Sequence, residues 1–280
     1  ATLMATARHT FDNAAGSVTE VFSGTRNAWP AEAVAHQGFS SSAVILPAVR
    51  GLFGLEGDAA AKKLRFAPRL PANWGEARVE SFRLGPATFS FSCTRRAFAG
   101  SGSVRPVGND ADAGPPPVDD EIFEIAVQSD NALGWQLQLA PLFGPGTRVV
   151  EVAVDGKPTR YTPPEGRQGV QPVVPVTVQS TTVRVAFRIT PTVEILPPPV
   201  ESRTGDGDEG LKLIRVARDG DRLKVAVEGL SGRVYLLPLT HPELIQGVEG
   251  GLLLGSAVRL KIPETPGGGF APHAVTITMK

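Results

Sequence analysis

The period of the hydrophobic pattern changes at Leu64, and this change constrains the fold more than any other feature. Before Leu64, apolar residues recur at helical spacing, and from Leu64 onward they alternate with polar residues. The chain also contains 31 glycines and 25 prolines among 280 residues, which divide its second part into short segments. The sequence therefore predicts a mainly β protein in which two N-terminal helices precede a β-sandwich and a smaller immunoglobulin-like β unit.

The first predicted helix covers residues 1–14, ends before Gly16, and places Leu3, Ala7, Thr10 and Phe11 on one face. The second runs from Gly38 to Leu55, with Pro47 either near its first turn or at a kink. Its apolar residues occur on more than one side, so we expect it to be well buried. Two such helices cannot bury their faces alone. Because the chain starts without methionine and within a predicted helix, we expect a fragment whose helical partners lie before residue 1 or on another chain.

Alternating segments predict the β-strands that follow. A hairpin is expected for Ala77–Leu84 and Thr88–Cys93, which flank Gly85-Pro86. Asp155-Gly156 predicts a two-residue hairpin turn. The further predicted strands are Phe123–Gln128, Gly134–Ala140, Val149–Val154, Val173–Val178, Thr182–Ile189, Leu213–Ala217, Leu223–Val227, Val234–Leu237, Val258–Ile262 and Ala274–Thr278.

Two segments rich in Gly, Pro, Ser and Asp predict linkers, at residues 100–120 and 196–209. We therefore expect three domains: residues 1–60, 61–200 and 201–280. The Asp206–Glu209 run within the second linker has oxygen ligands of the kind that Ca²⁺ binds, but it lacks the rest of a calcium-loop pattern. A solvated linker is the alternative that we favour there.

Composition argues against several classes of function. Lys plus Arg equals Asp plus Glu at 28 each, which disfavours a nucleic-acid or membrane surface as the main role. No apolar run approaches about 18 residues, so no membrane-spanning helix is expected. Cys93 is the only cysteine, and the histidines show no metal-ligand spacing, so we predict neither metal nor cofactor. The compartment stays open between cytoplasm and periplasm.

Glu20 is the first candidate catalytic residue. It lies between Gly16 and Gly24 in a 20-residue stretch without periodicity, and long loops of this kind are often functional. Glycoside hydrolysis commonly needs two carboxyl groups, and a base that holds a water must stay ionised on a polar segment. The alternative is an ordinary solvated glutamate.

A polar and aromatic cluster follows at the expected start of the second helix. His36 and Gln37 could donate hydrogen bonds to sugar hydroxyls, while Trp29 or Phe39 could stack on a pyranose ring. The alternative is a plain helix N-terminus with an aromatic core anchor. Residue types and spacing alone do not separate the two interpretations.

The order of features in residues 16–92 resembles the end of the catalytic domain of six-hairpin glycosidases, the (α/α)₆-barrel superfamily. This superfamily includes glucoamylases, the amylo-1,6-glucosidase part of debranching enzymes, trehalases and α-L-rhamnosidases. The resemblance rests on Glu20 in a Gly-bounded loop, on a polar, aromatic and Ser helix opening, on a Gly-Leu pair at the helix end, and on a strand with a Pro-containing segment. The helix opening is Gln37-Gly38-Phe39-Ser40 and the helix end is Gly51–Asp58. The strand and its Pro-containing segment are Leu64–Pro71, followed by Trp74.

The resemblance implies that residues 1–60 end an (α/α)₆ barrel and that the parent activity is hydrolysis of an α-glycosidic bond with inversion. Glu20 would be the general base, with His36, Gln37, Trp29 and Phe39 at the sugar. The general acid would lie upstream, so the partners would be an oligo- or polysaccharide and the missing barrel helices. A debranching-type α-glucosidase is the first expectation, and an α-L-rhamnosidase the second. A non-catalytic carbohydrate-binding or structural β module is the alternative from another class.

Overall fold

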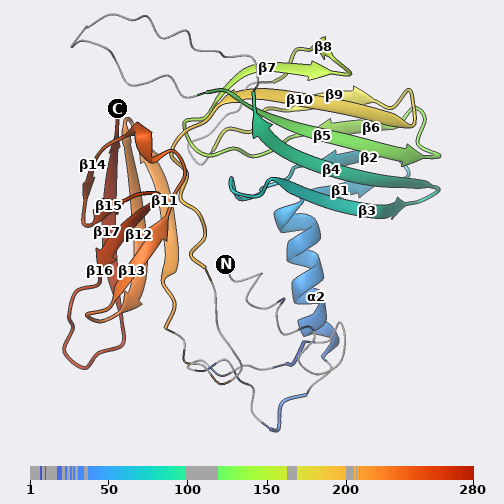
Figure 1. Ribbon diagram of the computed structural model, residues 1–280. Helices are drawn as coiled ribbons and strands as arrows, with labels where there is room; N and C mark the ends of the chain where they lie inside the picture. The colour runs from blue at the N-terminus through green and yellow to red at the C-terminus, as the bar shows by residue number, and fades with distance from the viewer. Residues whose placement is uncertain are drawn as a thin grey trace, which may run out of the picture.

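The computed structural model describes residues 37–98, 119–162, 169–199 and 209–280, with shorter stretches at 7, 10, 18–20, 23, 26, 28, 31–34, 205 and 207. The described chain is mainly β, as the alternating pattern predicts, and its strands form two stacks of sheets (Figure 1). The predicted helix at residues 1–14 lies almost wholly outside the described residues.

Among the described residues, one short helix with a π-helical extension precedes the sheets. Helix α2 spans Gly38–Leu46 and continues directly into a π-helical turn, η2, at Pro47–Leu52. Pro47 has no backbone N–H and its ring crowds the preceding turn, which explains why the hydrogen-bonding pattern changes there. The predicted end at Leu55 is three residues too long, because Leu55 already begins the first strand.

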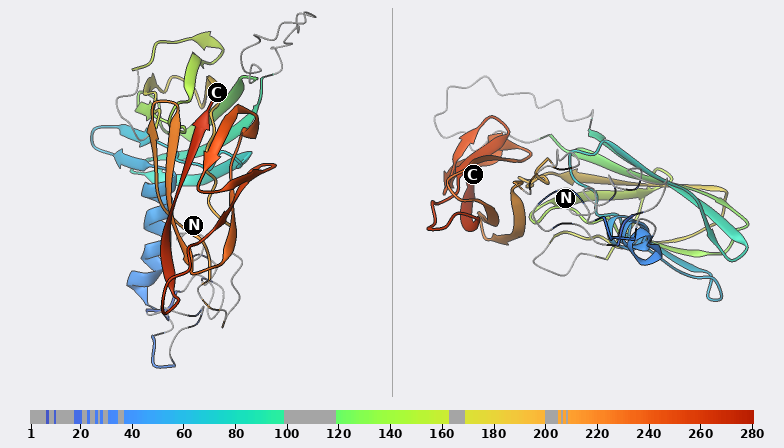
Figure 2. Two further views of the ribbon diagram at one scale, coloured as in Figure 1. Left: turned by 90° about the vertical axis from the view of Figure 1, so that its left-hand side faces the viewer. Right: turned by 90° about the horizontal axis from the view of Figure 1, so that it is seen from below.

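The prediction that this helix is well buried is wrong for the described chain. Phe39 is 85% exposed and Ile45 is 65% exposed. No charged residue occurs between Gln37 and Val49, so the helix has no charged side that would normally face solvent. Figure 1 shows α2 projecting from the sandwich beside β1 and β3, and Figure 2 shows the same from two further directions. A helix that is apolar all round is normally buried, whereas the described residues leave these side chains of α2 exposed.

The end of the helix is tied firmly to the sandwich. The amide of Arg69 donates to the carbonyl of Leu52 at 2.7 Å, and the amide of Ala67 lies 3.2 Å from the carbonyls of Phe53 and Gly54. Gly54 has φ +59°, a left-handed conformation that ends the helix and turns the chain into the first strand.

The larger stack is a sandwich of two sheets. The four-stranded sheet has the order β1-β2-β6-β9, and the six-stranded sheet has the order β3-β4-β5-β10-β7-β8. All pairings are antiparallel except that of β2 with β6. The strands are β1 (Leu55–Asp58), β2 (Lys63–Phe66), β3 (Glu76–Leu84), β4 (Ala87–Ala97), β5 (Glu121–Asp130), β6 (Gln136–Leu139), β7 (Arg148–Val154), β8 (Lys157–Pro158), β9 (Val174–Thr177) and β10 (Thr182–Thr190).

Alternate residues of both sheets fill the core of this sandwich, as strand periodicity requires. Phe66 of β2 stacks on Phe91 of β4, with ring centroids 4.2 Å apart, and Phe89 meets Trp135 edge to face at 5.3 Å. Burial raises the pKa of the Cys93 thiol to about 12, so this cysteine acts as a small apolar core residue.

The second stack is a smaller unit with its own core. One sheet has the order β11-β12-β17-β14 and the other has the order β13-β16-β15. Buried Leu223, Val258 and Ile277 belong to its hydrophobic cluster. Its strands are β11 (Lys212–Asp219), β12 (Arg222–Leu230), β13 (Val234–Pro238), β14 (Ile245–Glu249), β15 (Leu252–Leu254), β16 (Ala257–Lys261) and β17 (Phe270–Met279).

The change from one core to the other falls between Ile189 and Val193, earlier than the expected domain boundary after residue 200. The reason is an extra pairing that follows the first core. The amide of Thr240 donates to the carbonyl of Glu194 at 3.0 Å, and the amide of Leu196 donates to the carbonyl of Pro238 at 2.9 Å. The first residues of the predicted second linker thus pair with the end of β13, and the chain returns to this unit at β11.

Candidate functional site

Two groups of residues qualify as candidate sites: the N-terminal segment around Glu20 and a charged cluster between the two β units. In the first, Glu20 is exposed. Its backbone amide donates to the carbonyl of Val34 at 3.0 Å, and the amide of Gln37 donates to the carbonyl of Val18 at 3.3 Å. The loop that carries Glu20 therefore runs beside the segment that opens α2, although the two are separated by about 16 residues.

Only two of the other four predicted site residues are among those that the structure describes. Gln37 is half-buried and Phe39 is exposed, whereas His36 and Trp29 lie outside the described residues. Buried Thr19 supports the segment, because its hydroxyl donates to the carbonyl of Val34 at 3.2 Å. The assignment of these residues to a sugar site stays a prediction.

The predicted calcium motif is likewise only partly described. Glu209 forms an ion pair with Arg233, and Gly207 forms a β-bridge with Arg26. Asp206 and Asp208 lie outside the described residues. Within the described ranges, no group of three or more His, Cys, Asp or Glu side chains is arranged to hold a metal ion.

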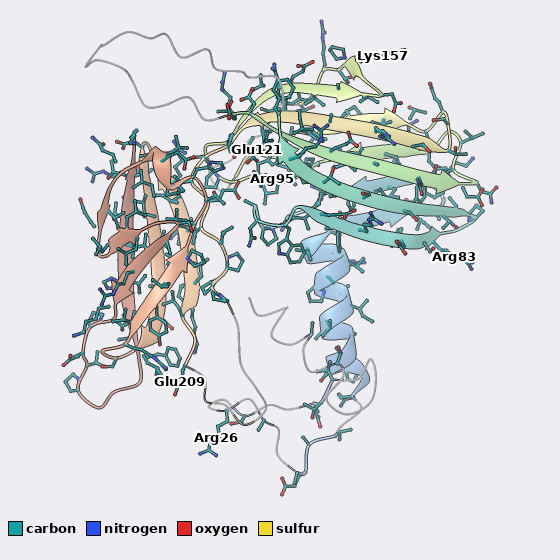
Figure 3. All side chains as sticks on the ribbon, in the orientation of Figure 1. Arg26, Arg83, Arg95, Glu121, Lys157 and Glu209 are labelled. Carbon is teal, nitrogen blue, oxygen red and sulfur yellow. The ribbon has the colours of Figure 1, made fainter. Side chains whose placement is uncertain are left out.

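The second candidate is a cluster of charges that sequence reasoning missed. Arg95 near the end of β4 places its Nε 2.6 Å from Oε2 of Glu121 at the start of β5. Its Nη2 lies 3.4 Å from Oε1 of Glu194, which belongs to the segment that pairs with the second unit. Figure 3 labels Arg95 and Glu121 where the sandwich meets that unit. Arg95 is only 10% exposed, so its charge is shielded from solvent and depends on both carboxylates.

His241 joins the same cluster from the second unit. Its Nε2 lies 3.5 Å from Oε1 of Glu121, and its Nδ1 lies 3.0 Å from Oε1 of Glu243. His241 lies in the turn after β13 and has a left-handed backbone, with φ +51°. The hydrogen bond to Glu121 raises the pKa of His241; burial opposes this effect, and Glu243 adds to it.

Glu121 responds in the opposite direction. Burial alone would raise the pKa of Glu121, but its hydrogen bond with His241 and the charge of Arg95 outweigh burial and lower it. The cluster is thus a chain of alternating charges that joins strand ends of one unit to the turn after β13 in the other. Half-buried groups with shifted pKa values mark functional sites in many proteins, and ion-pair networks with a structural role shift pKa values as well.

Two glycines allow the units to approach closely beside this cluster. A Cβ atom at Gly144 would lie 2.5 Å from Cγ of Glu194, and one at Gly146 would overlap Nη1 of Arg218. That guanidinium donates to the carbonyl of Pro145 at 3.1 Å and to the hydroxyl of Thr192 at 3.3 Å. The units therefore meet through a shaped and hydrogen-bonded contact, and the charged cluster is best explained as the centre of that contact.

The pKa shifts predict how the stability of this contact depends on pH. Because the pKa of His241 is raised in the folded state, its contribution is complete below about pH 6.5, the unfolded value, and is lost as the pH rises through the folded value. The lowered pKa of Glu121 adds stability above about pH 4.5 that is lost in stronger acid. Stability from this cluster should be greatest between these two values.

His241→Gln should therefore remove about 1 kcal/mol of unfolding free energy at pH 6 and much less at pH 9. Urea unfolding followed from pH 5 to pH 9 measures this difference. His273→Gln is the matched control, because His273 is half-buried and hydrogen-bonds the carbonyl of Gly250 within its own unit. A pH dependence that is the same in both variants would contradict the role of His241.

The comparisons with known proteins identify no relative: no family model, no curated protein and no solved structure matches this chain. In the part of the chain that the structure describes, no helix is long and apolar enough to cross a membrane.

Proposed function

We propose that this chain is the C-terminal part of an inverting glycoside hydrolase that acts on α-glycosidic bonds, of the debranching α-glucosidase type. The observation that carries the proposal is the backbone pairing of the Glu20 segment with the Val34–Gln37 segment at the start of α2. These bonds support the proposal, because they bring the backbone of exposed Glu20 near Gln37, the residue before an apolar helix that is exposed among the described residues. The resemblance to (α/α)₆-barrel enzymes explains all three features together.

In this proposal Glu20 is the general base. Its carboxylate accepts a proton from the water that attacks the anomeric carbon, while a second carboxylic acid protonates the leaving oxygen. In inverting enzymes the two carboxyl groups are about 6.5–9.5 Å apart to leave room for that water. The acid and the helices that cover α2 would come from upstream barrel residues or from a partner chain. Within the same class, α-L-rhamnosides are the second choice of substrate.

Hydrolysis of aryl α-glucosides, aryl α-rhamnosides and branched dextrins tests the proposal, using the longest product of the gene that contains these residues. Glu20→Gln should lower kcat by about a thousandfold, because the base is lost but the shape is kept. Glu32→Gln is the matched control, since Glu32 is an exposed glutamate of the same segment, and it should leave kcat unchanged. Azide added to Glu20→Ala should restore part of the rate on an α-glucoside and yield a β-glycosyl azide.

The outcomes separate the roles. A normal rate in Glu20→Gln would refute the assignment of the base. A retained product configuration would refute inversion. Absence of hydrolysis of every substrate by the longest gene product would refute the enzyme proposal.

A non-catalytic carbohydrate-binding module is the second candidate, and one observation favours it. The outer face of the six-stranded sheet has a hollow of about 360 Å³ that is lined by residues with polar side chains. Hydroxyl, amide and carboxylate groups of this kind can donate and accept hydrogen bonds with sugar hydroxyls. The lining residues are Thr88, Ser90, Gln128, Ser129, Asp130, Thr181 and Thr182. Retarded migration in gels that contain glycogen or dextrin, abolished by Gln128→Ala but not by Glu20→Gln, would favour this candidate.

A further inference from the structure

The outer face of the small sheet β13-β16-β15 is apolar where a solvated sheet face should be polar. Leu236 of β13 and Leu252 of β15 are 56% and 57% exposed, and both are paired in register with Arg259 of β16. Val234 precedes Leu236 on the same face, and Leu254 follows Leu252. An antiparallel sheet with one face on a core normally alternates apolar and polar residues, so this face departs from the expected pattern.

The inner face of the same sheet is already satisfied. Leu237, Val258 and Leu260 are buried in the core of the second unit. The outward leucines are therefore not core residues turned outward by a shift in strand register, because the residues that alternate with them point inward and pack in the core. Both faces of this sheet are apolar. Four of the five large apolar side chains exposed among the described residues of this unit gather on this sheet: Val234, Leu236, Leu252 and Leu254. Such a contiguous exposed patch marks an interaction surface.

An unpaired positive charge lies at the centre of this patch. Arg259 is exposed and has no ion-pair or hydrogen-bond partner within the ranges that the structure describes. Lys261, two residues along β16, adds a second positive charge and is paired with Glu264 beyond the end of the strand. None of the residues of β13, β15 and β16 is acidic. The surface is therefore apolar and positively charged, and arginine at the centre of an apolar patch is typical of protein interfaces.

The dimensions of the patch fit one helix. The outer strands β13 and β15 are two strand spacings apart, or about 10 Å, which is the diameter of an α-helix with its side chains. Along the strands the patch extends from the Val234–Lys261 pair to the Pro238–Ala257 pair, a rise of about 13 Å, or between two and three helical turns.

We propose that this face binds an amphipathic helix of a partner protein whose apolar side carries a carboxylate that pairs with Arg259. The leucines supply the apolar contact and Arg259 selects the charge. A second copy of this chain fits less well, because two such faces would bring Arg259 against the same unpaired positive charge, and β13, β15 and β16 contain no acidic residue to compensate it. The proposal does not depend on the catalytic role of Glu20.

Synthetic 18-residue amphipathic helices with a leucine face and one variable residue at its centre test this proposal by fluorescence anisotropy. The peptide with Glu should bind the protein about fivefold more tightly than the peptide with Gln, and the peptide with Lys should bind most weakly. In Arg259→Glu the order should reverse, so that the Lys peptide binds best. In Leu252→Ser every peptide should bind at least tenfold more weakly.

Two controls separate this face from other exposed surfaces, including the apolar side of α2. Ile214→Ser removes an equally exposed apolar side chain from β11, and Arg222→Glu reverses an exposed charge on β12; both should bind the peptides as the original protein does. An unchanged charge order in Arg259→Glu, normal binding in Leu252→Ser, or no binding of any peptide at millimolar concentration would overturn the proposal. Self-association that Leu252→Ser abolishes would also overturn it, in favour of a second copy.

Discussion

Gly54→Ala should lower the free energy of unfolding of the larger sandwich by about 3 kcal/mol or more. A Cβ atom at this position would overlap the carbonyl oxygen of Ala67 and lie 2.8 Å from its Cβ. Both are atoms of the neighbouring backbone or attached directly to it, so no side-chain rotation relieves the overlap. The positive φ of +59° adds strain for any residue with a Cβ.

Gly156→Ala is the matched control within the same sandwich. Gly156, in the turn between β7 and β8, also has a positive φ, +77°, but no atom within 4 Å of the position of its Cβ. It should therefore cost only about 1 kcal/mol, the penalty of the left-handed backbone itself. Urea unfolding followed by the fluorescence of buried Trp135 and hydrogen exchange at the amides of Ala67 and Arg69 measure the difference. Equal costs in the two variants would contradict the close contact between the helix end and β2.

Arg95→Met should lower the unfolding free energy by about 2–3 kcal/mol near neutral pH. The substitution preserves much of the apolar stem but leaves Glu121 and Glu194 facing a position with no positive charge. Their side chains are 21% and 16% exposed, so water screens their repulsion only in part.

The exposed Arg78–Glu76 pair supplies the control, because it also joins an arginine to a glutamate on the same sheet. Arg78→Met should cost about 0.5 kcal/mol or less, as is usual for solvated pairs. The double variant Arg95→Met with Glu194→Gln should recover part of the loss, since one of the two unpaired charges is removed. Equal losses in Arg95→Met and Arg78→Met would show that the junction is not stabilised by this cluster.

The strands could be predicted where apolar and polar residues alternate and where a short turn joins two neighbouring strands. The hairpin at Gly85-Pro86 and the turn at Asp155-Gly156 are confirmed, because neighbouring residues along the chain determine them. β14 was not predicted, because Gln246 and Gly247 interrupt its alternation. The parallel pairing of β2 with β6 was also beyond prediction, since it depends on contacts between residues more than 70 positions apart.

The two candidate sites also differ in how far a local sequence pattern could reveal them. Glu20 was found because it lies in a loop bounded by glycines, although its chemical role remains a prediction. Arg95, Glu121 and His241 were missed because each is an ordinary polar residue in its own segment. His241 was considered only as a metal ligand and dismissed for lack of spacing. Only the contact between the two β units brings these three together, and no local pattern in a single sequence reports such a contact.

The parallel β2–β6 pair also has a consequence for the order in which the chain can fold. β2 is synthesised about 70 residues before β6, and β9 follows nearly 40 residues later, so the four-stranded sheet cannot close until residue 177 has left the ribosome. Until β6 has been synthesised, only β1 and β2 of the opposite sheet can cover the inward face of β4, and Phe89 lacks Trp135, against which it packs in the folded protein. Closure of such distant contacts is slow. We therefore expect the nascent chain to be prone to aggregation through this interval and to need a chaperone at physiological concentration.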